Sequence, residues 1–148
     1  MLRPFTFPLH QVYSLRAHVE SVAKAALARE LAAGAEREAE LQRADQALAS
    51  AQEAVKAEWA LSGADLAARQ LFLERRERER AAAELAAKAH GEVVAERTKE
   101  LETAAAERAA LDKLKDRYRA AHARKEARAE DARLGEVALS RHVRGEAA

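Results

Sequence analysis

The histidines are the residues of this chain best suited to hold a metal ion. A metal site on a helix usually places two histidines four residues apart, on one face, and no two histidines here have that spacing. His10 and His122 could approach each other if the chain folds back, but no third ligand accompanies them. The sequence therefore predicts no metal site and no cofactor. The five histidines are His10, His18, His90, His122 and His142.

Residues suited to catalysis show no recognisable arrangement either. No serine lies in a GxSxG context, and no glycine-rich loop could cradle a phosphate. Carboxylates are abundant, but they lie in charged helical stretches where no concave pocket would shift their pKa values for acid–base work. We expect no catalytic residues, so the chain should not be an enzyme.

The composition indicates long helices. Of 148 residues, 34% are charged and 4% are aromatic, and alanine, glutamate, arginine and leucine dominate. This balance is typical of coiled coils. Bulky residues are too few for a compact core, so we expect a narrow apolar seam and partners that supply part of the stability.

The net charge of +1 argues against nucleic acid as the main ligand, because nucleic-acid binders usually carry a strongly basic surface. The absence of cysteine excludes disulfides and thiolate metal sites. No apolar run approaches the roughly 20 residues that span a bilayer, and the N-terminus lacks the pattern of a signal peptide. We expect a cytoplasmic protein.

The first eight residues should be extended, because Pro4 and Pro8 interrupt helical hydrogen bonding. Pro8 suits the first turn of a helix, which we expect from about Leu9 to Ser62. Phe5 and Phe7 precede that helix. They either staple onto Leu9 or Val12 or serve as anchors for a partner.

Two apolar patterns follow each other along the first helix. A stripe with steps of three and four comprises Val12, Leu15, Val19 and Val22. After Ala26 the phase changes to a heptad position shared by Leu27, Gly34, Leu41, Leu48 and Val55. Such a slip locally changes the winding of a coiled coil. Gly34 should also lie level with Gly91 and Val93, which predicts a close approach or a soft spot there.

A turn at residues 63–64 should reverse the chain. Gly63 can take the left-handed conformation that ends a helix, and Asp65 can cap the next one. In the resulting register, facing residues have numbers that sum to about 127. This register predicts the pairs Leu9–Tyr118, Val12–Leu114, Leu15–Leu111, Leu27–Leu101, Leu41–Leu85 and Val55–Phe72.

The second helix should run from about Asp65 to Ala138, with a frayed tail from Arg141 to Ala148. Beyond about Ala120 the first helix offers no partner residues, so about 25 residues, or nearly 40 Å of helix, should overhang. The predicted fold is all-α: one antiparallel coiled-coil hairpin spanning residues 1–148.

Large apolar residues are concentrated near the turn. Leu71, Phe72 and Leu73 are consecutive, so they cannot all face one narrow seam, and Trp59 lies across the turn. They either close the hairpin tip or form an exposed binding patch. We favour the patch slightly.

Both ends of the chain resemble the FliJ family of flagellar export proteins. The segment from Phe5 to Arg16, FTFPLHQVYSLR, has the family's aromatic lead-in, spaced aliphatic residues and closing Leu-Arg. The segment from Leu111 to Tyr118, LDKLKDRY, and the later LGEVA from Leu134 match the other end. Gly135 departs from the Leu-Asp-Glu common in the family, which puts helix continuity there in doubt. The resemblance spans the whole length.

The resemblance implies a non-enzymatic role in type III export, like the central stalk of a rotary ATPase. One end would enter the hexameric flagellar export ATPase, and the other would contact the membrane export gate and couple ATP turnover to export. It also implies handling of export chaperones, and a cytoplasmic position held at the inner face of the membrane through these partners. The ring-end residues would be Phe7, Leu9, Val12, Leu15, Arg16, Leu114, Tyr118, Arg124, Arg128 and Arg133. The gate residues would be Trp59, Leu66, Leu71, Phe72 and Leu73.

Two other functions fit the same pattern. A structural coiled-coil spacer or homodimer would result if a helix ran straight through Gly63. The equivalent stalk of a virulence injectisome would share the hairpin, although the terminal segments favour the flagellar family.

Overall fold

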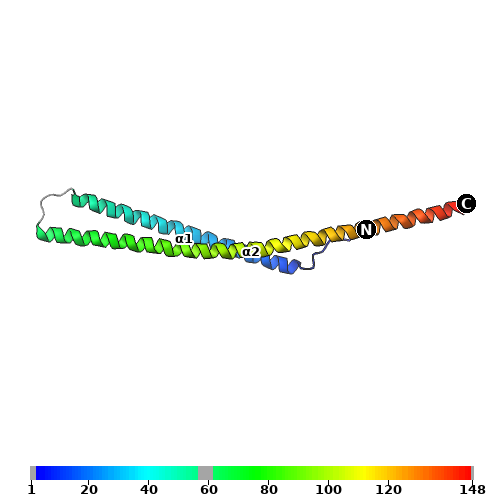
Figure 1. The fold of residues 1–148 in the computed structure, drawn as a ribbon, viewed down its shortest axis with the longest axis horizontal. Coiled ribbons are helices and arrows are strands. Elements are labelled where there is room, and N and C mark those ends of the chain that lie inside the picture. The colour runs from blue at the N-terminus through cyan, green and yellow to red at the C-terminus, as the bar shows by residue number, and fades with distance from the viewer. Residues whose placement is uncertain (1–2, 57–61, 148) are drawn as a thin grey trace. The chain divides into compact units, whose positions relative to one another are not determined.

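Two helices make up the fold of this computed structural model, which describes residues 3–56 and 62–147. Helix α1 comprises His10–Lys56 and helix α2 comprises Gly63–Glu146 (Figure 1). No strand occurs in these ranges, and the helices pack against each other. The prediction of an all-α helical hairpin is confirmed.

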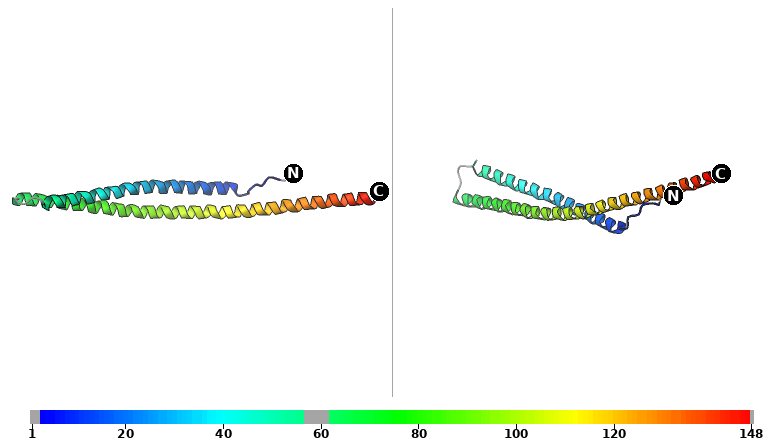
Figure 2. Two further views of the ribbon diagram at one scale, coloured as in Figure 1. Left: turned by 90° about the horizontal axis from the view of Figure 1, so that it is seen from above. Right: turned by 45° about the vertical axis from the view of Figure 1, so that its right-hand side comes forward.

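The chain groups into two compact units. The terminal unit comprises Met1–Glu20 with Ala104–Ala148, and the hairpin unit comprises Ser21–Thr103. Each unit contains an α1 segment and an α2 segment that run antiparallel. Both views of Figure 2 show the N-terminal segment of the terminal unit extending alongside the C-terminal half of α2.

Helix α1 begins behind Pro8, as predicted. The amide of His10 donates to the carbonyl of Phe7 at 3.1 Å, and that of Tyr13 donates to Leu9 at 2.9 Å. Proline costs no hydrogen bond here, because the first amides of a helix have no partner within it. The helix is described to Lys56, and its predicted continuation over 57–61 lies outside the described residues.

The start of α2 differs from the prediction. Gly63 is the first helical residue and does not have a positive φ, so it does not end α1 in a left-handed conformation. Ser62 is the capping residue: its Oγ accepts from the Asp65 amide at 3.3 Å and donates to the Asp65 carboxylate at 2.8 Å. Asp65 therefore occupies the third helical position, and its amide makes one of the two hydrogen bonds of a capping box with Ser62. It is not the cap itself.

The end of α2 also differs from the prediction. The helix passes through Gly135 and continues to Glu146, so neither an end near Ala138 nor fraying from Arg141 occurs. His142 and Glu146 face each other one turn apart, with Nε2 and Oε1 3.2 Å apart. The strong helix formers of this stretch outweigh the propensity cost of one glycine.

The seam of α1 does not follow the predicted valine stripe. Val12, Leu15, Val19 and Val22 are 43%, 59%, 39% and 52% exposed. The protected positions instead recur every seven residues with no phase slip, so that prediction is wrong. They are Tyr13, Glu20, Leu27, Gly34, Leu41, Leu48 and Val55.

A matching heptad of half-buried residues runs along α2, and it contains several charged side chains. Its members are Leu73, Arg80, Ala87, Val94, Leu101, Arg108, Lys115 and His122. Among the described residues only Phe7, Ala51 and Ala104 form a buried apolar core, and Glu20 is the buried charged residue. Ion pairs and small side chains thus occupy many of the seam positions that leucines fill in other coiled coils.

The predicted register agrees with contacts inside each unit. In the hairpin unit Arg80 Nε lies 2.5 Å from Asp45 Oδ1, and in the terminal unit the Phe7 and Tyr118 rings are 5.8 Å apart. Both pairs of numbers sum to 125, close to 127.

Several predicted leucine pairs are nevertheless wrong. Leu15 and Leu85 are 59% and 70% exposed, so neither covers the residue predicted opposite it, Leu111 or Leu41. Val12 likewise does not cover Leu114. The predicted register is close to the observed one. The predicted heptad of Leu27, Gly34, Leu41, Leu48 and Val55 lies in the seam, whereas the predicted stripe from Val12 to Val22 lies outside it.

Neither glycine at the predicted soft spot interrupts its helix. Gly34 serves a close approach: a Cβ there would come within 3.1 Å of His90 Cδ2. The His90 ring lies across α1 with Nε2 2.6 Å from the Glu30 carbonyl, to which it donates. A Cβ at Gly91 would meet nothing within 4 Å. The close contact is thus made by Gly34 and His90, and not by the two glycines.

Candidate interaction surfaces

The extended segment Arg3–Pro8, which we call the strap, packs on α2 in the terminal unit. Phe7 is 8% exposed and meets the Tyr118 ring edge to face, at 69°. Phe5 lies 5.7 Å from the His122 ring, and the Arg119 guanidinium lies 5.6 Å above its face. Aromatic pairs and cation–π contacts of this kind favour one docked position.

One hydrogen bond fixes the backbone of the strap. His122 Nε2 lies 3.0 Å from the Arg3 carbonyl, and since a carbonyl only accepts, the imidazole donates. Both phenylalanines contact α2, and Phe7 is not free to anchor a partner while the strap is docked. The staple with Leu9 or Val12 stays a prediction.

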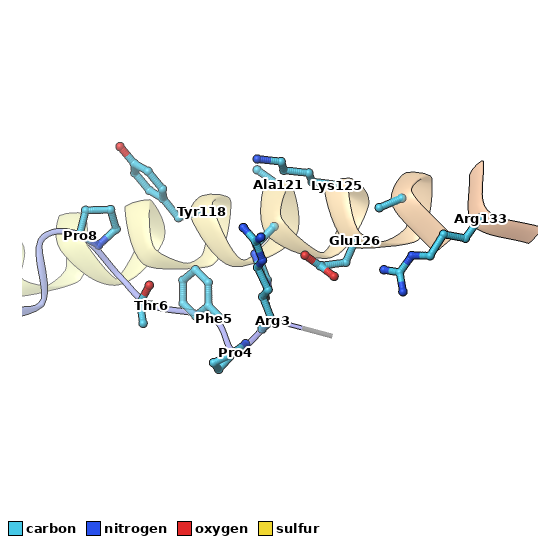
Figure 3. Close-up of a pocket in the computed structure, with 12 residues that line it drawn as sticks. Arg3, Pro4, Phe5, Thr6, Pro8, Tyr118, Ala121, Lys125, Glu126 and Arg133 are labelled. Atoms are coloured by element: carbon cyan, nitrogen blue, oxygen red, sulfur yellow. Dashed lines mark hydrogen bonds between the residues drawn. The ribbon is translucent and has the colours of Figure 1, made fainter. Parts of the chain in front are cut away.

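An open groove of about 610 Å³ lies between the strap and α2 (Figure 3). Phe5 and Arg3 point from the strap toward the helix, which contributes Tyr118, Lys125 and Arg133 to the lining. Three cations and one carboxylate, from Glu126, border it. The groove suits a ligand with anionic and apolar parts, but it is open and shallow, unlike the enclosed pocket of an enzyme.

The buried centre of the terminal unit is a polar cluster, the Glu20 cluster, formed by Tyr13, Glu20, Arg108 and Asp112. Glu20 is 5% exposed and accepts a hydrogen bond from Arg108 Nε, while Arg108 Nη1 donates to Asp112. The hydrogen bond to Glu20 raises the pKa of Arg108, and the adjacent carboxylate charges raise it further.

Tyr13 belongs to the same cluster. Its hydrogen bond with Asp112 raises its pKa above the ordinary value of 10.0, and partial burial acts in the same direction. The Lys115 ammonium lies 4.9 Å from the centre of its ring. Each charged group has a counter-charge nearby, which a buried polar network requires.

The predicted ring-end residues all lie in the terminal unit, but they differ in what they can contact. Val12, Leu15 and Tyr118 are exposed, whereas Phe7 is buried where the strap packs on α2. Leu9 and Leu114 are half-buried. Their availability to a partner therefore varies along the unit.

The predicted ring-end arginines divide in the same way. Arg16 pairs with Glu107 at 2.6 Å and Arg133 with Glu130 at 3.7 Å. Arg124 and Arg128 are exposed, and within residues 3–56 and 62–147 no carboxylate forms an ion pair with either. These last two are the arginines free to meet a partner.

The predicted gate residues lie in the hairpin unit. Leu66, Leu71 and Phe72 are 57%, 63% and 44% exposed, and the Arg76 guanidinium lies 5.1 Å above the Phe72 ring. Leu73 is half-buried in the seam. Trp59 lies outside the described residues. The described side chains thus match an exposed patch better than a closed tip.

Sequence reasoning missed two features. It did not predict the Glu20 cluster, although counting back by sevens from Leu27 leads to Glu20 and Tyr13. It also assigned no role to four exposed apolar residues near the end of α2, two inside the predicted helix and two beyond its predicted end at Ala138. These are Leu134, Val137, Leu139 and Val143, at 59%, 46%, 65% and 61% exposure.

Two further features are absent from the described ranges. No group of three histidine, cysteine or acidic side chains there is arranged to hold a metal ion. No helix in those ranges is both long and apolar enough to cross a bilayer.

Comparison with known protein families gives a match over nearly the whole chain. Residues 5–147 match the family model described as flagellar FliJ protein. The chain belongs to the FliJ family. No curated protein and no solved structure gives a significant match. FliJ-family membership makes the chain a structural component of the flagellar protein export apparatus. It also favours the flagellar reading over the injectisome one.

Proposed function

We propose that this FliJ-family chain is a non-enzymatic stalk whose terminal unit inserts into the hexameric export ATPase. One observation carries the proposal: every described residue from 127 to 147 is exposed, although the segment is helical. A single helix with that much uncovered surface gains little from its own packing. A surrounding ring would supply the missing contacts.

The apolar content of this segment supports insertion. Leu134 and Val137 lie on one side of the helix, and Leu139 and Val143 lie on nearly the opposite side. A single docking partner would need one apolar face. Apolar residues on opposite sides fit a helix enclosed by several subunits.

The hairpin unit would contact the membrane export gate. Its exposed Leu66, Leu71 and Phe72 lie in the first turns of α2, on different sides of the helix, and large apolar side chains are effective interface anchors. Trp59 belongs to the same proposal. Through these contacts the chain would couple ATP turnover to export and stay at the inner face of the membrane. Handling of export chaperones is part of the proposed role.

The experiment is ATP hydrolysis by the cognate flagellar export ATPase, measured with the full chain and with Leu139→Asp/Val143→Asp. Both residues are exposed, so the double variant should keep its helicity and lose stimulation or ring assembly. Glu136→Gln/Ser140→Ala, on the same segment, is the matched control and should stimulate normally. If the full chain neither binds nor stimulates the ATPase, the stalk proposal is wrong.

A structural homodimer is the second candidate, because the stripe of Val12, Leu15 and Val19 is exposed on α1. The capped start of α2 at Ser62 argues against a helix that runs straight through Gly63. Sedimentation equilibrium decides between the two: a monomer mass supports the hairpin stalk, and twice that mass supports the spacer.

A further inference from the structure

Four cations form a stripe along α2 in the terminal unit, which we call the basic stripe: Lys113, Arg117, Arg124 and Arg128. Their steps of four, seven and four residues place them within an arc of about 60° on an ideal helix. All four are exposed. The stripe thus presents one sign of charge on one face over about 22 Å of helix.

The cations of the stripe have no ion-pair partner among the described residues, although Asp131, three residues beyond Arg128, lies on the same face of the helix. Within the described part of the chain no carboxylate forms an ion pair with any of the four, whereas other arginines of α2 are paired, including Arg97 with Glu100 at 3.0 Å and Arg133 with Glu130 at 3.7 Å. The two acidic residues between Lys113 and Arg128 are Asp116 and Glu126. Both lie at least about 90° around the helix from the middle of the stripe.

Two shallow depressions of different character border the stripe. A shallow depression of about 190 Å³ is lined by Leu114, Arg117, Tyr118 and Ala121. A second, of about 320 Å³, is lined by Ala121, Arg124, Lys125 and Arg128. A ligand that covers the stripe therefore meets one apolar hollow beside Leu114 and Tyr118 and one hollow lined mostly by cations.

We propose that the basic stripe binds an acidic helix of a partner protein, with carboxylates at the spacing i, i+4, i+11 and i+15. Facing helices match charges at equal rise, the apolar hollow beside Leu114 accepts methyl and methylene groups of the partner, and the cationic hollow accepts a carboxylate. A nucleic-acid backbone or a lipid surface supplies anions but no such side chains. The net charge of +1 also leaves the chain without a broad basic surface.

The inference rests on the proposed function and deepens it, because it gives the chemistry of the surface that the terminal unit meets. It also separates residues that the sequence grouped together. Arg124 and Arg128 belong to the stripe, whereas Arg133 is paired and lies about 170° from its middle. The stripe thus combines Arg124 and Arg128, which were predicted as ring-end residues, with Lys113 and Arg117, which were not.

The test uses a synthetic helical peptide with four glutamates at this spacing in an alanine–glutamine background. A control peptide has the same composition with the glutamates distributed around the helix. We expect the full chain to bind the first peptide about tenfold more tightly than the second, with affinity that falls as salt is added. Equal binding of the two peptides would overturn the inference.

The variant Arg117→Glu/Arg124→Glu should lower affinity for the first peptide at least about tenfold. Arg29→Glu/Arg43→Glu makes the same charge change at two exposed arginines of the hairpin unit and should have no effect. A variant with glutamate at all four stripe positions should bind a lysine version of the peptide. Circular dichroism checks that each variant remains helical.

Anionic vesicles and a single-stranded oligonucleotide are tested in parallel. Stripe-dependent binding to either, without binding to the peptide, would overturn the inference in favour of that ligand. The ATPase assay separates the two proposals. If the chain binds the peptide but has no effect on the ATPase, the stalk proposal is wrong and the stripe proposal stands. If Arg117→Glu/Arg124→Glu stimulates the ATPase normally and the full chain does not bind the peptide, the stripe proposal is wrong and the stalk proposal stands.

Discussion

Tyr13 shows how a single residue reports on the Glu20 cluster. Its neutral form is favoured in the folded chain, because Asp112 accepts its hydrogen bond and burial disfavours the phenolate. Since the folded pKa lies above 10.0, the stabilisation is complete below that pH and is lost as the pH rises through the folded value.

The titration can be measured directly. The chain has two tyrosines, so Tyr118→Phe leaves Tyr13 as the one source of tyrosinate absorbance. We expect its pKa above 10.0, and Asp112→Asn in the same background should lower it toward that value. An unchanged pKa in Asp112→Asn would contradict the assigned hydrogen bond.

Glu20 is the residue where burial and charge oppose each other most. Glu20→Gln should lower the free energy of unfolding by about 1–2 kcal/mol, because it weakens the charge-assisted hydrogen bond to Arg108. Glu20→Leu/Arg108→Leu should recover or exceed the original stability, because apolar packing often equals a buried ion pair. Urea unfolding followed by circular dichroism measures both. A double variant less stable than Glu20→Gln would show that the pair is a net source of stability.

At the scale of the element, Ser62 decides where α2 begins. Ser62→Ala removes the acceptor for the Asp65 amide and should lower the free energy of unfolding by about 1 kcal/mol. Ser140→Ala, at an exposed position within α2, is the control and should have a smaller effect. Equal losses in the two variants would mean that the capping box contributes nothing.

The two glycines of the hairpin unit should respond differently to alanine. Gly91→Ala has open space and should stabilise by about 1 kcal/mol through helix propensity alone. Gly34→Ala places a methyl 3.1 Å from His90 Cδ2, and the ring is held by its bond to Glu30, so the gain should be offset. Thermal unfolding compares them. Equal gains in stability would show that the His90 ring can move aside without loss of stability. Gly34→Ala/His90→Ala should show the full stabilisation from helix propensity.

How far the sequence predicts each element depends on how local its cause is. The helices and the register follow from composition, Pro8 and the reversal near residue 62, all of which are local signals. The buried face of α1 was predicted correctly from Leu27 to Val55 but wrongly before Leu27, where apolar periodicity favoured Val12, Leu15 and Val19. The face of α1 that lies in the seam there is set by α2, whose Arg108 and Lys115 contact Glu20 and Tyr13.

The functional surfaces were predictable to a similar degree. The exposed Leu71 and Phe72 followed from three consecutive apolar residues that no single seam can bury. The strap's docked position did not, because Tyr118 and His122 are distant in sequence and nothing local pairs them with Phe5 and Phe7.

For the whole molecule, stability and partner binding should separate cleanly. Leu134→Asp should change the free energy of unfolding by less than about 0.5 kcal/mol, because the side chain is already 59% exposed. Leu101→Asp, half-buried in the seam, is the contrasting variant and should destabilise by several kcal/mol. Urea unfolding of both variants checks this, and a large loss in Leu134→Asp would reveal packing on that residue.

The scarcity of buried apolar side chains also affects how the protein responds to temperature. The heat capacity change of unfolding comes mainly from apolar surface newly exposed to water, and the described chain buries only Phe7, Ala51 and Ala104. Its value per residue should therefore lie below the usual range of about 12–15 cal/mol/K. The stability curve would then be broad and flat, so that warming or cooling the cell changes the folded population of this export component only gradually.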